Sequence, residues 1–184
     1  MIKKFFGMMI FAAMIFFAQN AFAAPDVIYQ VHVQDYGWMS PVRNGEVAGT
    51  TGEGKRIEAI VISSPDEIEY NAHVQNIGWQ GWTPSSAVAG TVGEGLRMEA
   101  IQIRLTGSLA NRYDVYYRAH VENIGWQDWV SNGRIAGTEG QGLRVEALQI
   151  EIVEKGSRHH HNRHGRDRYG RDKYERDRYD DYRW

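Results

Sequence analysis

The chain has 184 residues, with no cysteine, 20 glycines and six tryptophans. The lack of cysteine excludes a disulfide scaffold, a thiol nucleophile, cysteine-ligated zinc and an iron–sulfur cluster. The formal net charge of −2 averages unlike regions: residues 24–155 carry ten basic and seventeen acidic side chains, a net charge of −7, whereas residues 156–184 carry +3. The sequence therefore predicts a mildly acidic body followed by a mildly basic tail.

Residues 1–24 have the layout of a secretory signal peptide. Two lysines, Lys3 and Lys4, precede an apolar run over 5–17, and residues 21–23 match an A-x-A cleavage site. The apolar run is shorter than the roughly 20 residues that span a bilayer, so we expect cleavage near Ala23 or Ala24 and no transmembrane segment in the mature chain. The sequence thus predicts a protein that is secreted or held in the bacterial cell envelope or at the cell surface.

One unit recurs three times, over about residues 26–65, 67–106 and 114–155. Each copy contains a tyrosine, a histidine and a tryptophan at fixed spacing: Tyr29, His32 and Trp38; Tyr70, His73 and Trp79; Tyr117, His120 and Trp126. An Ala-Gly-Thr segment and an Arg-x-Glu-Ala segment follow in the same order in every copy. Extra residues over 106–116 lie between the second and third copies, where a surface loop accommodates additional length at low cost.

Each copy has the pattern of short strands separated by turns, without helix signals. In the third copy we expect strands over 117–124 and 143–153, with shorter strand segments on either side of a turn at 131–133. Simple alternation in the last strand of the second copy places Arg97, Glu99 and Ile101 on one face and Met98 and Ala100 on the other.

A unit of about 41 residues is too small to bury an adequate core alone, so the three copies must share one. We therefore expect an all-β, pseudo-threefold domain over 25–155. A β-prism-like arrangement is favoured over a β-trefoil, because three strands per copy are easier to find than four. An open row of stacked repeats is the remaining alternative.

Each copy resembles the clostridial hydrophobic repeat with a tryptophan, the ChW repeat. The similarity rests on the Gly-Trp pair, a second tryptophan three residues later at Trp82 and Trp129, the Asn132-Gly133 turn, and the two later segments. It implies a repeat of secreted and surface proteins, often found in sets of three and proposed to bind cell-wall or other polymers or proteins. The first copy departs from the pattern, because Pro41 stands where the second tryptophan is expected.

The tryptophans fall into two predicted groups. Trp38, Trp79 and Trp126 recur in every copy and are predicted to fill the shared core, since aromatic rings dominate core burial. Trp82 and Trp129 are candidate ligand-binding residues, whose flat faces would stack on the apolar face of a sugar ring. Alternatively, these two rings cover the edge of their own sheet.

His32, His73 and His120 are candidate ligand-binding residues with three alternative roles. Each imidazole forms a hydrogen bond to a neighbouring turn, or faces a repeated ligand site, or converges with the other two on a metal near the threefold axis. The Arg and Glu of each Arg-x-Glu-Ala segment are predicted to be structural ion pairs.

Residues 156–184 are rich in Arg, Asp, Tyr, His and Gly and are expected to be a disordered tail. Regular tyrosines amid mixed charges favour either weak multivalent contact with envelope polymers or a solubilising role. His159, His160, His161 and His164 are candidates for loose metal binding.

No constellation in the sequence indicates an enzyme or a cofactor. The chain has no G-x-S-x-G, H-E-x-x-H or phosphate-loop motif. We therefore expect a non-catalytic binding or adhesion module that recognises a polysaccharide or a surface protein. The alternatives are a self-associating scaffold and metal capture by the tail. Nucleic acid is not expected as a partner, because export removes it and the interleaved aspartates weaken the tail's positive field.

Overall fold

The computed structural model describes residues 24–63 and 66–157. The expected signal peptide and tail, including the four tail histidines, therefore lie outside the described residues. The first copy contains β1 (Ile28–Val33), β2 (Gly37–Trp38), β3 (Val42–Arg43), β4 (Ala48–Gly49) and β5 (Ile57–Ser63). The second contains β6 (Ile68–Val74), β7 (Gly78–Trp79), β8 (Thr83–Pro84), β9 (Val88–Gly90) and β10 (Met98–Leu105). After α1 (Leu109–Arg112), the third contains β11 (Tyr113–Val121), β12 (Gly125–Trp126), β13 (Val130–Ser131), β14 (Ala136–Gly137) and β15 (Val145–Glu154).

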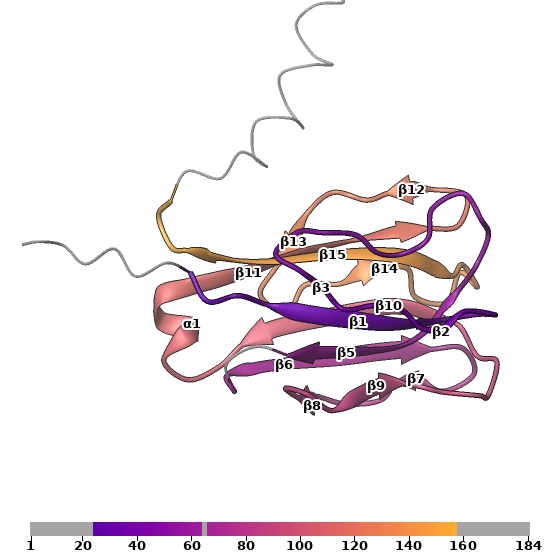
Figure 1. Cartoon of the computed structure of the whole chain (residues 1–184), viewed down its shortest axis with the longest axis horizontal. Coiled ribbons are helices and arrows are strands. Elements are labelled where there is room, and N and C mark those ends of the chain that lie inside the picture. The colour runs from indigo at the N-terminus through magenta and orange to yellow at the C-terminus, as the bar shows by residue number, and fades with distance from the viewer. Residues whose placement is uncertain (1–23, 64–65, 158–184) are drawn as a thin grey trace, which may run out of the picture.

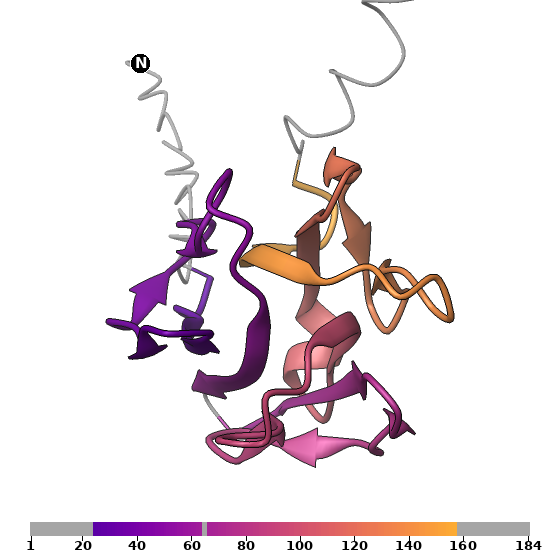
Figure 2. The same ribbon diagram turned by 90° about the vertical axis from the view of Figure 1, so that its right-hand side faces the viewer.

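Each copy builds one antiparallel sheet around its two long strands, which are β1 with β5, β6 with β10, and β11 with β15. The free edge of each sheet is covered by the short Ala-Gly strand of the next copy. Strand β9 pairs with β5, β14 pairs with β10, and β4 of the first copy pairs with β15 of the third. This exchange closes a ring of three sheets (Figure 2).

The exchanged strands approach their partners so closely that glycine is required. At Gly137, φ is +109°, and an added Cβ would lie 2.4 Å from the carbonyl oxygen of Glu99. Gly49 and Gly90 occupy the equivalent positions and meet equivalent backbone atoms at 2.3 Å. Because a Cβ is never found at such distances from backbone, the glycine of Ala-Gly-Thr is a condition of ring closure.

Buried tyrosines link neighbouring copies through the core. Tyr29, Tyr70 and Tyr117 are at most 1% exposed. The Tyr70 hydroxyl donates a hydrogen bond to the carbonyl of Ala87 in its own copy and accepts one, at 3.2 Å, from the N–H of Ile62 in the first copy. Tyr29 accepts an equivalent bond, at 3.1 Å, from Ile150 in the third copy. Burial raises the pKa of Tyr70 and raises those of Tyr29 and Tyr117 to about 12.

The prediction of an all-β, prism-like domain made from three pseudo-equivalent copies is confirmed. One detail of the strand pattern is wrong: a β-bulge in β10 between Met98 and Ala100 shifts the register against β6. Met98 is fully buried in the same core cluster as Ile101, so the two side chains share the inward face. An inserted residue reverses the alternation beyond it, which simple period-two counting cannot anticipate. The insertion expected as a loop also contains the short helix α1.

The two ends of the domain are formed by different elements. Helix α1 and both ends of the segment that begins at residue 24 and finishes at residue 157 lie at one end (Figure 1). The opposite end, here called the turn end, is formed by the turns 34–36, 75–77 and 122–124 and the glycine-rich loops 51–54, 92–95 and 139–142. None of the helical structure described between residues 24 and 157 has the length and apolar character needed to cross a bilayer.

Candidate binding site at the turn end

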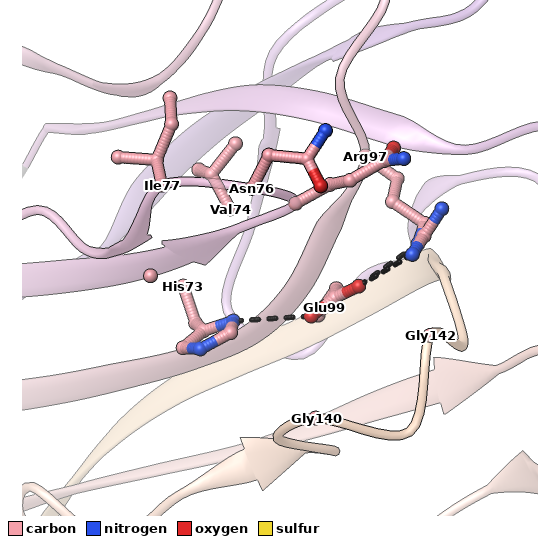
Figure 3. Close-up of a pocket in the computed structure, with 10 residues that line it drawn as sticks. His73, Val74, Asn76, Ile77, Arg97, Glu99, Gly140 and Gly142 are labelled. Carbon is pink, nitrogen blue, oxygen red and sulfur yellow. Dashed lines mark hydrogen bonds and ion pairs between the residues drawn. The ribbon is translucent and has the colours of Figure 1, made fainter.

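A cluster of histidine, glutamate and arginine occupies the same place in each copy. In the second copy Glu99, only 5% exposed, accepts a hydrogen bond of 3.0 Å from Arg97 Nε and lies 2.7 Å from Arg97 Nη2. Its other oxygen lies 3.3 Å from His73 Nδ1 (Figure 3). The approach of Nδ1 is not that of a directed hydrogen bond, so this contact is chiefly electrostatic.

The first and third copies repeat the cluster with nearly the same geometry. The His32 Nδ1–Glu58 Oε2 and His120 Nδ1–Glu146 Oε2 distances are both 3.1 Å. Arg56 and Arg144 bind these two buried carboxylates at 2.6 and 2.9 Å. The predicted ion pairs are therefore present in all three copies, and each buried carboxylate has a cationic partner, as burial of a charge requires.

Each histidine also packs against the tryptophan of its own copy. The ring centroids of His73 and Trp79 lie 5.2 Å apart in an edge-to-face arrangement, and the other two copies show 5.5 Å and 5.4 Å. His73 is paired with Trp79 across β6 and β7, and cross-strand partners project from the same face of a sheet. That face is the outer one, because Ala72 and Val74 on either side of His73 are fully buried.

The prediction that Trp38, Trp79 and Trp126 fill the shared core is therefore wrong. Trp38 is 39% exposed, and the other two rings are half-buried at the surface. The core position belongs to the recurring tyrosine of the long strand, because the inward face of β1 holds Tyr29, Val31 and Val33. Trp38 pairs with His32 and follows that residue outward.

The cluster of each copy faces the glycine-rich loop of the next copy across a seam. The first seam lies between copies one and two, the second between two and three, and the third between three and one. An open pocket of about 460 Å³ lies at the second seam and is lined by His73, Asn76, Arg97, Gly140 and Gly142, among others (Figure 3). Arg97 also lies near the backbone at Gly142, and Arg56 and Arg144 lie near Gly95 and Gly54 in the same way.

The three seams differ in the residue that follows Ala-Gly-Thr. At the second seam this residue is Glu139, which accepts a hydrogen bond of 2.6 Å from the indole Nε1 of Trp79. The equivalent residue is Val92 at the first seam and Thr51 at the third. At the third seam Glu122 adds a second carboxylate to Arg144, whereas the equivalent residues Gln34 and Gln75 are uncharged.

Trp82 and Trp129 lie on the outer faces of the sheets, and arginines cover them. Trp82 is 38% exposed, and the Arg104 guanidinium lies 3.9 Å from its ring centroid, held there by Glu69. Arg118 lies 4.9 Å from the Trp129 ring and 4.7 Å from the Trp126 ring. Desolvation lowers the pKa of Arg118, and the charge of Glu151 opposes that shift. These arginines already occupy ring faces that a sugar would use.

The histidines do not meet at the axis. Each contacts the carboxylate of its own copy, and residues 24–63 and 66–157 contain no group of three or more His, Asp or Glu side chains placed to hold a metal ion. The structure thus places His32, His73 and His120 at three separate seams. The metal candidates His159, His160, His161 and His164 fall outside the described part of the chain.

Three contributors to the turn end were missed by sequence reasoning. Tyr36, Ile77 and Ile124 sit at equivalent turn positions and are 57%, 50% and 52% exposed. Their signal was present, because a large apolar residue in an Asx-rich turn before Gly-Trp has no inward face to occupy. The Trp79–Glu139 contact had no such signal, since it joins different copies and is not repeated.

Comparison with known families agrees with these repeats. The model of the Clostridial hydrophobic W (ChW) family matches the chain three times, at residues 32–63, 73–107 and 120–154, which together make up more than half of it. Searches of curated proteins and of solved structures each found no match. The three matches correspond to the three copies of the repeat, and the chain belongs to the ChW family.

Proposed function

We propose that this protein is a non-catalytic binding module that is secreted or held at the bacterial cell surface and that binds a polysaccharide at its turn end. The observation that carries the proposal is the cluster repeated at the three seams, where polar side chains fixed by a buried carboxylate stand beside an indole at the surface. Sugar recognition uses this combination, with a flat apolar ring for one face of a pyranose and oriented polar groups for its hydroxyls.

Repetition supports a polymer as the ligand. Three like clusters lie at one end of a single rigid ring, so a long chain with repeated units can contact more than one of them. Weak sites linked in this way bind through avidity. The turn end also lies opposite both ends of the described segment, so a chain attached at either end leaves the binding face free (Figure 1).

Charge supports a neutral polymer over nucleic acid or another polyanion. Residues 24–155 carry a net charge of −7, and Asp35, Glu53 and Glu94 lie in the turns and loops of the turn end. A surface with this excess of carboxylates repels polyanions at moderate ionic strength.

Retention of the full chain on insoluble peptidoglycan and on neutral α- and β-glucans tests the proposal. We expect retention by at least one of these polymers, and its loss in the triple variant Trp38→Ala/Trp79→Ala/Trp126→Ala. The matched control is Trp82→Ala/Trp129→Ala, which removes the two tryptophans whose rings arginines cover. Loss in the control alone would move the site to the sheet faces. No retention on any polymer would reject the proposal.

A second candidate function is supported by a ring of exposed apolar residues just before each Ala-Gly-Thr segment. Val47, Val88 and Ile135 are 45%, 51% and 39% exposed and occupy equivalent positions. Such a ring suits contact with a surface protein or a second copy of the chain. Light scattering over a range of concentrations tests self-association, and a monomer at high concentration would reject the scaffold role.

A further inference from the structure

The three seams are not equivalent, and their differences rank them as binding sites. We propose that the first seam is the principal site of the domain and that it takes an uncharged pyranose on Trp38. This inference rests on the polysaccharide-binding function proposed above and specifies where, and on which residues, the sugar is held.

The first seam presents the largest aromatic surface of the three. Trp38 is 39% exposed, whereas Trp79 and Trp126 are less exposed at the equivalent position. The turn beside it holds Tyr36, 57% exposed, where the other copies have Ile77 and Ile124. The Tyr36 hydroxyl bonds to Glu53 in the loop 51–54 at the third seam, so the more exposed indole of Trp38 supplies the flat contact area at the first seam.

The indole of Trp38 is also available as a hydrogen-bond donor. At the second seam Glu139 takes the Nε1–H of Trp79 at 2.6 Å and places an exposed carboxylate against the ring. Val92 stands in the place of Glu139 at the first seam and offers no acceptor. Val92 is 48% exposed, so it extends the apolar surface beside Trp38 across the seam. The Glu139 carboxylate therefore occupies the position beside Trp79 that a sugar would use, whereas Val92 leaves the equivalent position beside Trp38 open to a sugar.

The polar groups around Trp38 favour an uncharged ligand. Asp35, in the turn before Trp38, holds Lys55 at 2.6 Å. The adjacent Lys55 lowers the pKa of Asp35, so this carboxylate stays ionised at neutral pH. Hydroxyl groups of a neutral sugar can bond to such carboxylates, whereas a uronate would be repelled by them.

The third seam differs from the first in the groups around its tryptophan and its arginine. Its tryptophan, Trp126, has the Arg118 guanidinium 4.7 Å from its ring centroid, and its arginine, Arg144, is bound by both Glu122 and Glu146. One side of the indole is therefore occupied by a cation, and the polar cluster carries one more carboxylate than that of the first seam. The expected order of affinity is the first seam above the other two.

Titration of the full chain with chitohexaose, cellohexaose and maltohexaose, followed by NMR of the indole N–H groups, tests this ranking. Trp→Phe variants assign the indole signals. We expect the Trp38 signal to shift at the lowest sugar concentration, and Trp38→Ala to weaken affinity at least tenfold. Trp79→Ala should weaken it by no more than about twofold. Hexagalacturonate, the charged comparison, should produce no shift of Trp38.

Exchanging the residues that distinguish the seams provides the decisive variants. Val92→Glu should lower affinity at least fivefold, whereas the uncharged control Val92→Thr, which installs the residue of the third seam, should not. Glu139→Val should make the Trp79 signal respond to sugar. Equal responses of all three indoles, or no effect of Val92→Glu, would overturn the ranking while leaving the polysaccharide-binding proposal intact. Absence of any indole shift with every sugar, together with no retention on polymers, would overturn both.

Discussion

Tyr29 lies inside the domain and Trp38 lies at its surface, although both residues recur in every copy. The difference follows from strand alternation: Tyr29 shares the inward face of β1 with Val31 and Val33, and Trp38 pairs with the outward His32. The interior also varies little among copies, whereas the turn end differs at each seam. A residue that recurs in every copy can therefore lie in the core or at the surface, and recurrence by itself does not indicate burial.

Substitution of a glycine that closes the ring is among the largest expected effects. Gly137→Ala should cost about 3–5 kcal/mol, because its Cβ meets the Glu99 carbonyl at 2.4 Å and φ is +109°. Gly140→Ala is the matched control, since nothing lies within 4 Å of its Cβ and only the positive φ opposes it, at about 1 kcal/mol. Urea unfolding of both variants measures the difference. Equal costs would show that the exchanged strand does not hold the ring closed.

Removal of the arginine that pairs with a buried carboxylate has the next largest expected effect on stability. Arg97→Met should lower the free energy of unfolding by about 3 kcal/mol, because it leaves Glu99, 5% exposed, without its arginine. Arg43→Met is the control, because exposed Arg43 forms a surface ion pair with Asp26, and we expect it to change stability by less than about 0.5 kcal/mol. Addition of Glu99→Gln to Arg97→Met should restore part of the loss. No recovery would indicate that packing, and not the stranded charge, causes it.

The buried tyrosines predict an alkaline limit to stability. Burial raises the pKa of Tyr117 from 10.0 to about 12, so the unfolded chain releases this proton first as pH rises. The contribution is complete below pH 10 and is lost between about pH 10 and pH 12. Tyr117→Phe should cost about 1–3 kcal/mol at pH 7, because it strands the Ile103 N–H and the Arg134 carbonyl, and it should flatten the alkaline loss. Thermal unfolding across this pH range, with exposed Tyr36→Phe as the control, measures both effects.

The smallest expected effect is on the surface tryptophan. Trp38→Ala should change the free energy of unfolding by less than about 1 kcal/mol, because the ring is 39% exposed and lies outside the core. Tyr29→Ala, at 1% exposed, should cost about 3–5 kcal/mol by the cavity that it creates. Chemical denaturation of this pair sharpens the comparison directly. If Trp38→Ala lowered the free energy of unfolding as much as Tyr29→Ala, the tryptophan would have a structural role.

The sequence by itself determined the family, the number of copies, the all-β class and the need for a shared core. These conclusions depend on local spacing and on the size of one unit, both of which can be counted along the chain. The Arg–Glu pairs could also be predicted from the sequence, because residues i and i+2 of a strand lie on the same face. Counting alternate residues assigned Met98 to the wrong face of the strand. The bulge in β10 adds a residue there, and no sequence motif indicates that bulge.

Only the tertiary structure decided which recurring aromatic lies inside and which residues meet across the seams. The pairing of β4 with β15 joins residues almost at opposite ends of the domain sequence, and Glu139 reaches Trp79 from another copy. Such contacts are set by ring closure, whose geometry depends on all three copies at once. A single copy contains neither the neighbour that it donates a strand to nor the neighbour that covers its own edge, so its sequence cannot specify them.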